Sequence, residues 1–204
     1  MAGPAFNILM RNPLTATQIR ALDAWLRTFT GGLETRTNAA GEQDEWYFRV
    51  DDANALGLLD RFRACMIGLA LIDPTREMDE DEEEQIMIQL GFWPRHGINV
   101  YAMCSNFSTG RVASYLILRL LERYDGYLDL CMREKLPASI PLDADERASE
   151  QNIPGKRYII RFWGPDPQYA SYFSCWWQKD VIDTERLRWW LQDENRVLPG
   201  FSME

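Results

Sequence analysis

The order of segments along this 204-residue chain predicts an α+β fold in which helices pack on a single mixed sheet. Runs rich in β-branched and aromatic residues indicate strands, and segments with apolar residues every three or four positions indicate amphipathic helices. The chain is also 46% hydrophobic, which is enough for one substantial core. We therefore expect a single domain over residues 1–204.

The N-terminal part is predicted to contain a strand followed by a helix. Residues 5–11, AFNILMR, have the composition of a strand. Residues 19–29 carry apolar side chains at helical spacing. We expect Thr15 or Thr17 to cap this helix, and Gly31 with Gly32 to close it.

The middle of the chain contains one ambiguous segment between two clear strands. Residues 45–50, EWYFRV, and residues 97–105, GINVYAMCS, are predicted strands. Residues 53–64 can form a helix, and the apolar run at 65–72 is either a buried strand or an extension of that helix. An acidic segment follows, which we expect to become helical and to end near Leu90.

The clearest predicted helix spans residues 108–126, with Ser108 as its N-cap and Gly126 as its end. The remaining expected elements are strands at 127–132, 157–163 and 169–177, a long loop at 133–156, and a helix from Thr184. Residues 6–34 and 98–129 share the order strand, loop, helix, glycine and extended segment. This order suggests two weakly similar β-α-β units.

Charge and cysteine usage restrict the classes of partner. The formal net charge is −9, and no cluster of Lys and Arg resembles a nucleic-acid interface. An acidic chain is better suited to a protein partner with a basic surface. We expect no membrane contact, because no apolar run approaches the ~20 residues of a spanning helix and no signal peptide precedes the chain. The four widely spaced cysteines indicate reduced thiols in a cytoplasmic protein.

Residues suited to catalysis are sparse. His96 is the only histidine, which argues against a Ser-His-Asp triad and against a His-rich zinc site. The best small-ligand candidate is the loop at 104–111, CSNFSTGR, where a helix N-terminus and Arg111 could hold an anion or a nucleotide. Capping by Ser108 explains the same loop without a ligand. We expect no catalytic residues, no cofactor and no metal.

The acidic run is the strongest candidate for partner binding. Seven of the eight residues at 77–84 are acidic. If Asp73 caps the helix, much of the run forms like-charged pairs that cost about 0.2–0.5 kcal/mol each. If Asp79 caps it, most of the charge lies in a favourable first turn. In either case the run forms a strong negative surface, made by Asp79, Glu80, Asp81, Glu82, Glu83 and Glu84.

Exposed tryptophans are the second candidate. In each pair, Trp176 with Trp177 and Trp189 with Trp190, one ring can enter the core while the other remains accessible. Accessible aromatic rings are favoured anchors of protein interfaces. We expect Trp93, Trp177 and Trp190 to contact a partner.

Three stretches resemble one bacterial family: GPAFNILM at 3–10, LGFWPRHGINVYAMCS at 90–105 and LILRLLERYDGYLDL at 116–130. They are similar to immunity proteins of polymorphic toxin and interbacterial competition systems. The resemblance implies a cytoplasmic, non-enzymatic protein that neutralises one cognate toxin by occluding its active site.

Two alternative functions stay open: an enzyme that binds a small anion at 104–111, and an adaptor or secretion chaperone. The oligomeric state also stays open.

Overall fold

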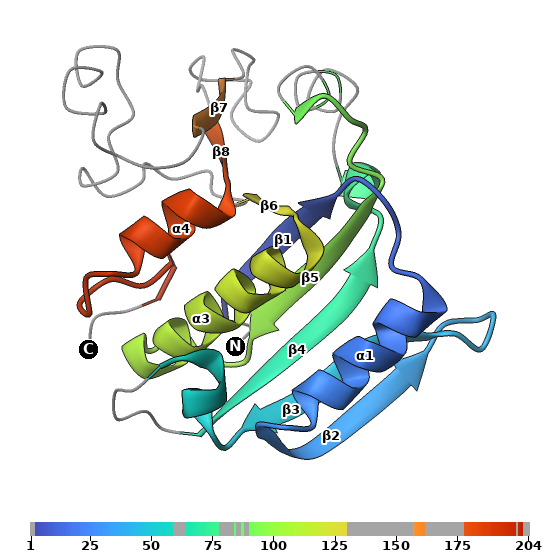
Figure 1. The fold of residues 1–204 in the computed structure, drawn as a ribbon, viewed down its shortest axis with the longest axis vertical. Coiled ribbons are helices and arrows are strands. Elements are labelled where there is room, and N and C mark those ends of the chain that lie inside the picture. Colours follow the sequence, from blue (N-terminus) through green and yellow to red (C-terminus); the bar gives the residue numbers. More distant parts are fainter. Residues whose placement is uncertain are drawn as a thin grey trace, which may run out of the picture.

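A computed structural model gives the fold of the chain (Figure 1). It describes residues 3–58, 64–77, 84, 87, 90–129, 157–161, 178–198, 200 and 201. The elements, in chain order, are β1 (Ala5–Met10), α1 (Ala16–Leu26), β2 (Thr30–Thr37), β3 (Gln43–Val50), the 3₁₀ helix η1 (Ala53–Leu56), β4 (Cys65–Ile72), the 3₁₀ helix η2 (Pro74–Glu77), β5 (His96–Ala102), α3 (Phe107–Tyr124), β6 (Tyr127–Asp129), β7 (Arg157–Arg161), β8 (Gln178–Ile182) and α4 (Thr184–Trp190).

The strands form one eight-stranded sheet in the order β2-β3-β4-β5-β1-β6-β8-β7. The predicted α+β class, with helices packed on a single sheet, is confirmed. The sheet was expected to be mixed, but every pair of neighbouring strands in it is antiparallel. The reason is that β2 to β5 follow one another as an antiparallel meander, while the crossovers through α1 and α3 join strands that are not neighbours in the sheet.

The two helical crossovers give the sheet its layered form. Helix α1 connects β1 to β2 across three intervening strands, and α3 connects β5 to β6 across β1. Both helices lie on the same face of the sheet (Figure 1), and α4 packs against α3. The two expected β-α-β units are therefore present as successive crossovers, and their first strands, β1 and β5, are neighbours.

The core lies between this helical layer and the sheet. Alternate residues of each strand point to the same face, so the buried apolar positions of the central strands meet the helices. These positions are Phe6, Ile8, Trp46, Phe48, Ile67, Leu69, Ile98 and Val100, and each is at most 2% exposed. Leu22 and Leu26 of α1 pack against them, as do Leu116 and Leu120 of α3.

The start of α1 agrees with the sequence, whereas both ends of α3 differ from the prediction. Thr15 caps α1 in a capping box, because its hydroxyl accepts from Gln18 N at 3.3 Å while Gln18 Oε1 accepts from Thr15 N at 2.9 Å. The cap of α3 is Asn106, which accepts from Thr109 N at 2.9 Å, and the prediction of Ser108 was wrong. The helix ends at Asp125 in the left-handed conformation (φ 49°), one residue before the predicted glycine.

Several other predictions are corrected. Helix α1 ends at Leu26, and Gly31 and Gly32 belong to strand β2, which the polar sequence TGGLETRT did not reveal. Strand β8 was also missed. The apolar run at 65–72 is a strand, and of the helix expected at 53–64 the described part forms only η1.

The predicted strand at 169–177 and loop at 133–156 lie outside the described residues.

The structure describes two features that flank the acidic run. Asp73 Oδ1 accepts from Thr75 N at 3.2 Å at the start of η2, and Gly91 N donates to Met87 O at 2.8 Å. Glu84, Met87 and Leu90 are helical, which confirms that a helix ends near Leu90.

Candidate interaction face

One face of the sheet points away from α1 and α3 (Figure 1). We call it the helix-distal face and define it by the strand residues that alternate with the core positions. Across β3, β4 and β5 these are Glu45, Tyr47, Arg49, Met66, Gly68, Ala70, Asn99 and Tyr101, followed by Met103 just after β5. Antiparallel sheets commonly leave one face accessible, so this arrangement is compatible with binding.

Large apolar side chains are exposed at both ends of this face. Met66 and Met103 are 43% and 37% exposed, and they are neighbours because Met103 N donates to Met66 O at 3.1 Å. Trp93 is 46% exposed and lies close to the other end, three residues before β5 begins. These are the large hydrophobic side chains that stay exposed in the described part of the chain.

Between these ends, two tyrosines form a fixed aromatic pair. The rings of Tyr47 and Tyr101 meet edge to face, with centroids 6.0 Å apart and planes at 74°. The Arg36 guanidinium lies 4.5 Å from the Tyr47 ring centroid, and Tyr47 Oη donates to Glu45 Oε2 at 3.0 Å. Burial and a hydrogen bond with Tyr47 raise the pKa of Tyr101. Tyr101 therefore stays neutral at physiological pH.

The Tyr101 ring lies over Gly68, which leaves room for it because glycine has no side chain. A Cβ atom at this position would overlap the ring of Tyr101, which is its partner in the β4–β5 register. The absence of a side chain therefore leaves the space that the ring fills. This contact restricts the ring before any partner binds.

A row of polar residues crosses the centre of the same face. Asn7 on β1 lies opposite Asn99 on β5 and opposite Asp129 on β6. Asn99 Nδ2 donates to Asn7 Oδ1 at 2.7 Å, and Asn7 and Asp129 are buried. Buried amides and carboxylates of this kind need hydrogen-bond partners, so the row fixes the pairing of the central strands.

Next to this row, part of the helix-distal face is covered by the chain itself. Leu9, Leu90, Phe92 and Val181 form a second small core with Tyr127. The Arg11 guanidinium lies 5.0 Å from the Phe92 ring centroid. Because Phe92 is buried here, its neighbour Trp93 faces outward at the edge of the cluster.

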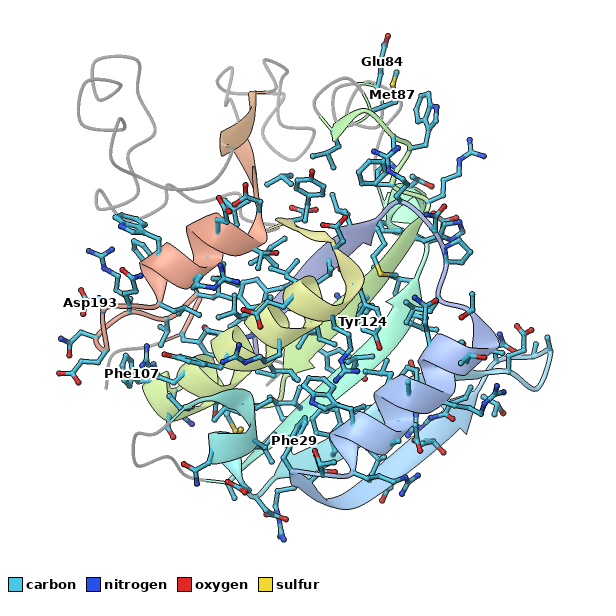
Figure 2. All side chains as sticks on the ribbon, in the orientation of Figure 1. Phe29, Glu84, Met87, Phe107, Tyr124 and Asp193 are labelled. Atoms are coloured by element: carbon cyan, nitrogen blue, oxygen red, sulfur yellow. The ribbon has the colours of Figure 1, made fainter. Side chains whose placement is uncertain are left out.

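The predicted partner-binding residues have different outcomes. Glu84 is exposed and projects beyond the end of the sheet where β4 ends and β5 begins, with Met87 beside it (Figure 2). Asp79, Glu80, Asp81, Glu82, Glu83 and Trp177 lie outside the described residues. Trp93 is accessible, as expected.

Trp190 is not the accessible ring of its pair. It is 7% exposed, and its indole Nε1 donates to Val197 O at 3.2 Å. The physical reason is helical spacing, because Leu187 and Trp190 lie on the side of α4 that enters the core, where Leu191 joins them just after the helix ends. Trp189 is the half-buried ring, and the Arg196 guanidinium lies 5.5 Å from its centroid.

The loop at 104–111 is organised around the C-terminal segment. Arg111 is 5% exposed and its Nη1 donates to Arg196 O at 3.0 Å and Asp193 O at 3.3 Å. Asp193 lies beside the first turns of α3 (Figure 2). Ser114 Oγ reinforces this contact by accepting from Leu198 N at 3.0 Å. Arg111 thus binds backbone carbonyls, which removes it as the basic residue of the predicted anion site.

Among the residues that the structure describes, no group of three or more His, Cys, Asp or Glu side chains is placed to hold a metal ion. None of the helices that the structure describes combines the length and the apolar character required to cross a membrane.

Sequence reasoning missed Tyr47, Tyr101, Met66 and Met103. Alternation within residues 45–50 and 97–105 could have placed the two tyrosines on the face opposite the core, because each lies directly between two apolar residues that are buried. It could not have shown which face the helices leave accessible.

Comparison with known proteins places the chain in a family. The search of curated proteins and the search of solved structures gave no match. Residues 2–199 match a family of unknown function (DUF6368). Because that match spans almost the whole chain, this protein belongs to the DUF6368 family.

Proposed function

We propose that this chain is an immunity protein that binds a cognate bacterial toxin in the cytoplasm and occludes its active site. The observation that favours it is the helix-distal face, where Met66 and Met103 are exposed at one end, Trp93 lies near the other, and the tyrosine pair is held between them. Exposed apolar and aromatic side chains set among polar groups are typical of protein interfaces.

Rigidity of the face supports binding. The Tyr101 ring packs over Gly68 and against Tyr47, and Tyr47 is held by Glu45 and Arg36. The side chains that a partner would contact here already have restricted conformations before binding. Less entropy is then lost on association, which is the usual advantage of a preorganised surface.

Charge would act mainly on the rate of association. The chain has a formal net charge of −9, and Glu84 is exposed next to the end of the face where Trp93 lies. A negative field of this kind attracts a toxin with a basic surface and accelerates encounter at low salt. The apolar anchors would then determine how slowly the complex dissociates.

The test uses the product of the adjacent upstream gene as the candidate toxin. The toxin is expressed alone and together with this chain, and growth and co-purification are measured. We expect toxicity without the chain, and growth with a stable complex when it is present. A gene product that is harmless by itself refutes the proposal. A complex that forms without restoring growth instead indicates an adaptor or a secretion chaperone.

Variants locate the binding face. Trp93→Ala and Met66→Lys are each expected to weaken toxin binding about 30-fold, which corresponds to about 2 kcal/mol. The matched control is Ala24→Lys, which adds the same charge at an exposed position of α1 on the opposite side. If Ala24→Lys weakens binding as much as Met66→Lys, the helix-distal face is not the interface. Unfolding curves for all three proteins separate binding effects from lost stability.

A further inference from the structure

Two free cysteines face each other at one end of the β4–β5 pair. The register aligns Ile67 with Ala102, and the hydrogen bond from Met103 N to Met66 O, at 3.1 Å, continues it by one residue. The next position in that register sets Cys65 opposite Cys104, and both are free thiols. The sequence separates these residues widely, so only the strand pairing brings them together.

The type of pairing suits a disulfide bond. In an antiparallel ladder, hydrogen-bonded and non-hydrogen-bonded pairs alternate. Because Met66 and Met103 are a hydrogen-bonded pair, Cys65 and Cys104 occupy a non-hydrogen-bonded one, where Cα atoms lie about 4.5 Å apart. Disulfides span Cα separations of about 4.4–6.8 Å. Cys65 also shares its face with Ile67, and Cys104 shares its face with Ala102, so both thiols lie on the helical side of the sheet.

The two thiols differ in accessibility. Cys104 is exposed, whereas Cys65 is 7% exposed and packs in the main core. Burial and the neighbouring Cys104 raise the pKa of Cys65 to about 12, while a hydrogen bond with Thr109 acts in the opposite direction. A reagent in solution therefore meets Cys104 first.

We propose that Cys65 and Cys104 form a reversible disulfide, in which Cys104 is the entry point for a small-molecule disulfide and Cys65 is the resolving thiol. The Cys104 thiolate attacks one sulfur of the reagent, forms a mixed disulfide and releases one equivalent of small thiolate. The Cys65 sulfur, as it loses its proton, then attacks the Cys104 sulfur and displaces the second equivalent. The protein loses two hydrogen atoms, and the reagent is reduced to two thiols.

The bond has a structural consequence. It closes residues 65–104 into a loop and joins the start of β4 to the residue that follows β5 by two positions. Met66 and Met103 form the next pair of the register, and their side chains lie on the other face of the sheet. Oxidation therefore fixes the backbone directly behind this exposed methionine pair.

The experiment treats the folded full-length protein with oxidised glutathione, followed by alkylation and mass spectrometry of intact protein and peptides. We expect the mass to fall by two hydrogen atoms and a peptide that links Cys65 to Cys104. Cys65→Ser is expected to retain glutathione on Cys104, and Cys104→Ser is expected to leave Cys65 unmodified.

Three results overturn the proposal: no reaction, glutathione retained on Cys104 while Cys65 is present, or a bond from either residue to Cys131 or Cys175. The Cys131→Ser/Cys175→Ser protein checks the linkage without competing thiols. If that variant does not fold, peptide mapping of the unmodified chain gives the same answer.

Discussion

Replacing Arg111 with methionine tests whether this buried guanidinium holds the C-terminal segment against α3. Methionine keeps much of the apolar stem and removes the donors. Nη1 of Arg111 binds the carbonyls of Arg196 and Asp193 at 3.0 and 3.3 Å, and the guanidinium lies 5.0 Å from the Tyr115 ring centroid.

The size of the effect follows from these contacts. A hydrogen bond from a charged donor contributes about 1.5–3 kcal/mol, and a partly desolvated cation–π contact adds about 1 kcal/mol. Removing the charge also removes the cost of burying it, which offsets part of the loss. We therefore expect Arg111→Met to lower the free energy of unfolding by about 2–4 kcal/mol. For a chain of this size that is a fall in Tm of about 5–15 °C.

The assay is urea unfolding, followed by intrinsic tryptophan fluorescence, to which Trp189 and Trp190 of α4 contribute. The matched control is Arg27→Met, since Arg27 is 55% exposed and its ion pair with Asp23 (2.8 Å) lies along the surface of α1. That change should cost no more than about 0.5 kcal/mol. Arg111→Lys should resemble Arg111→Met, because an ammonium group does not offer the same planar set of donors.

Equal losses in Arg111→Met and Arg27→Met would refute the structural role. The competing role, an anion site at 104–111, has its own signature. If phosphate raises the Tm of the unmodified chain and not that of Arg111→Met, the guanidinium binds anions after all.

Three further predictions concern stability. Gly68→Val should cost about 1–3 kcal/mol in urea unfolding, because the new side chain displaces the Tyr101 ring; an unchanged midpoint would contradict this packing. The pKa of Glu122 is lowered overall. Burial by itself would raise this pKa, but the hydrogen bonds from Arg188 and Arg119 outweigh the effect of burial. The stability that Glu122 adds is therefore present above its unfolded pKa and lost as pH falls through the folded value, so Glu122→Gln should cost about 0.5–1 kcal/mol at pH 7 and little near pH 3. Because the pKa of Cys65 is raised to about 12, its contribution is present below its unfolded pKa and lost as pH rises. Under reducing conditions, the unmodified chain should lose about 1 kcal/mol more than Cys65→Ala between pH 8 and pH 10, and parallel pH profiles would refute that assignment.

Strong local patterns made much of the fold predictable. The strands β1, β3 and β5 were found from their β-branched and aromatic residues, and α1 from its spacing and its Thr15 cap. Strand β2 was missed because it is an edge strand with mostly exposed positions, so no buried face imposes an alternating pattern on its sequence.

The candidate site was less predictable, because accessibility depends on which elements cover each residue. Trp93 and Glu84 were expected to be accessible and are. Trp190 was expected to be accessible and is buried, since either ring of the pair satisfies the same local spacing. Arg111 was assigned to an anion on the basis of its neighbours, and its actual partners lie more than eighty positions further along the chain.

The sequence by itself determined the α+β class, the main helices and strands, and the acidic charge, because periodicity, capping and composition are local properties. The tertiary structure decided which face of the sheet the helices leave accessible and that Tyr47 meets Tyr101. It also decided that Cys65 lies opposite Cys104. These features depend on the order and register of strands distant in the chain, and the free energy that fixes them comes from burying the whole core at once.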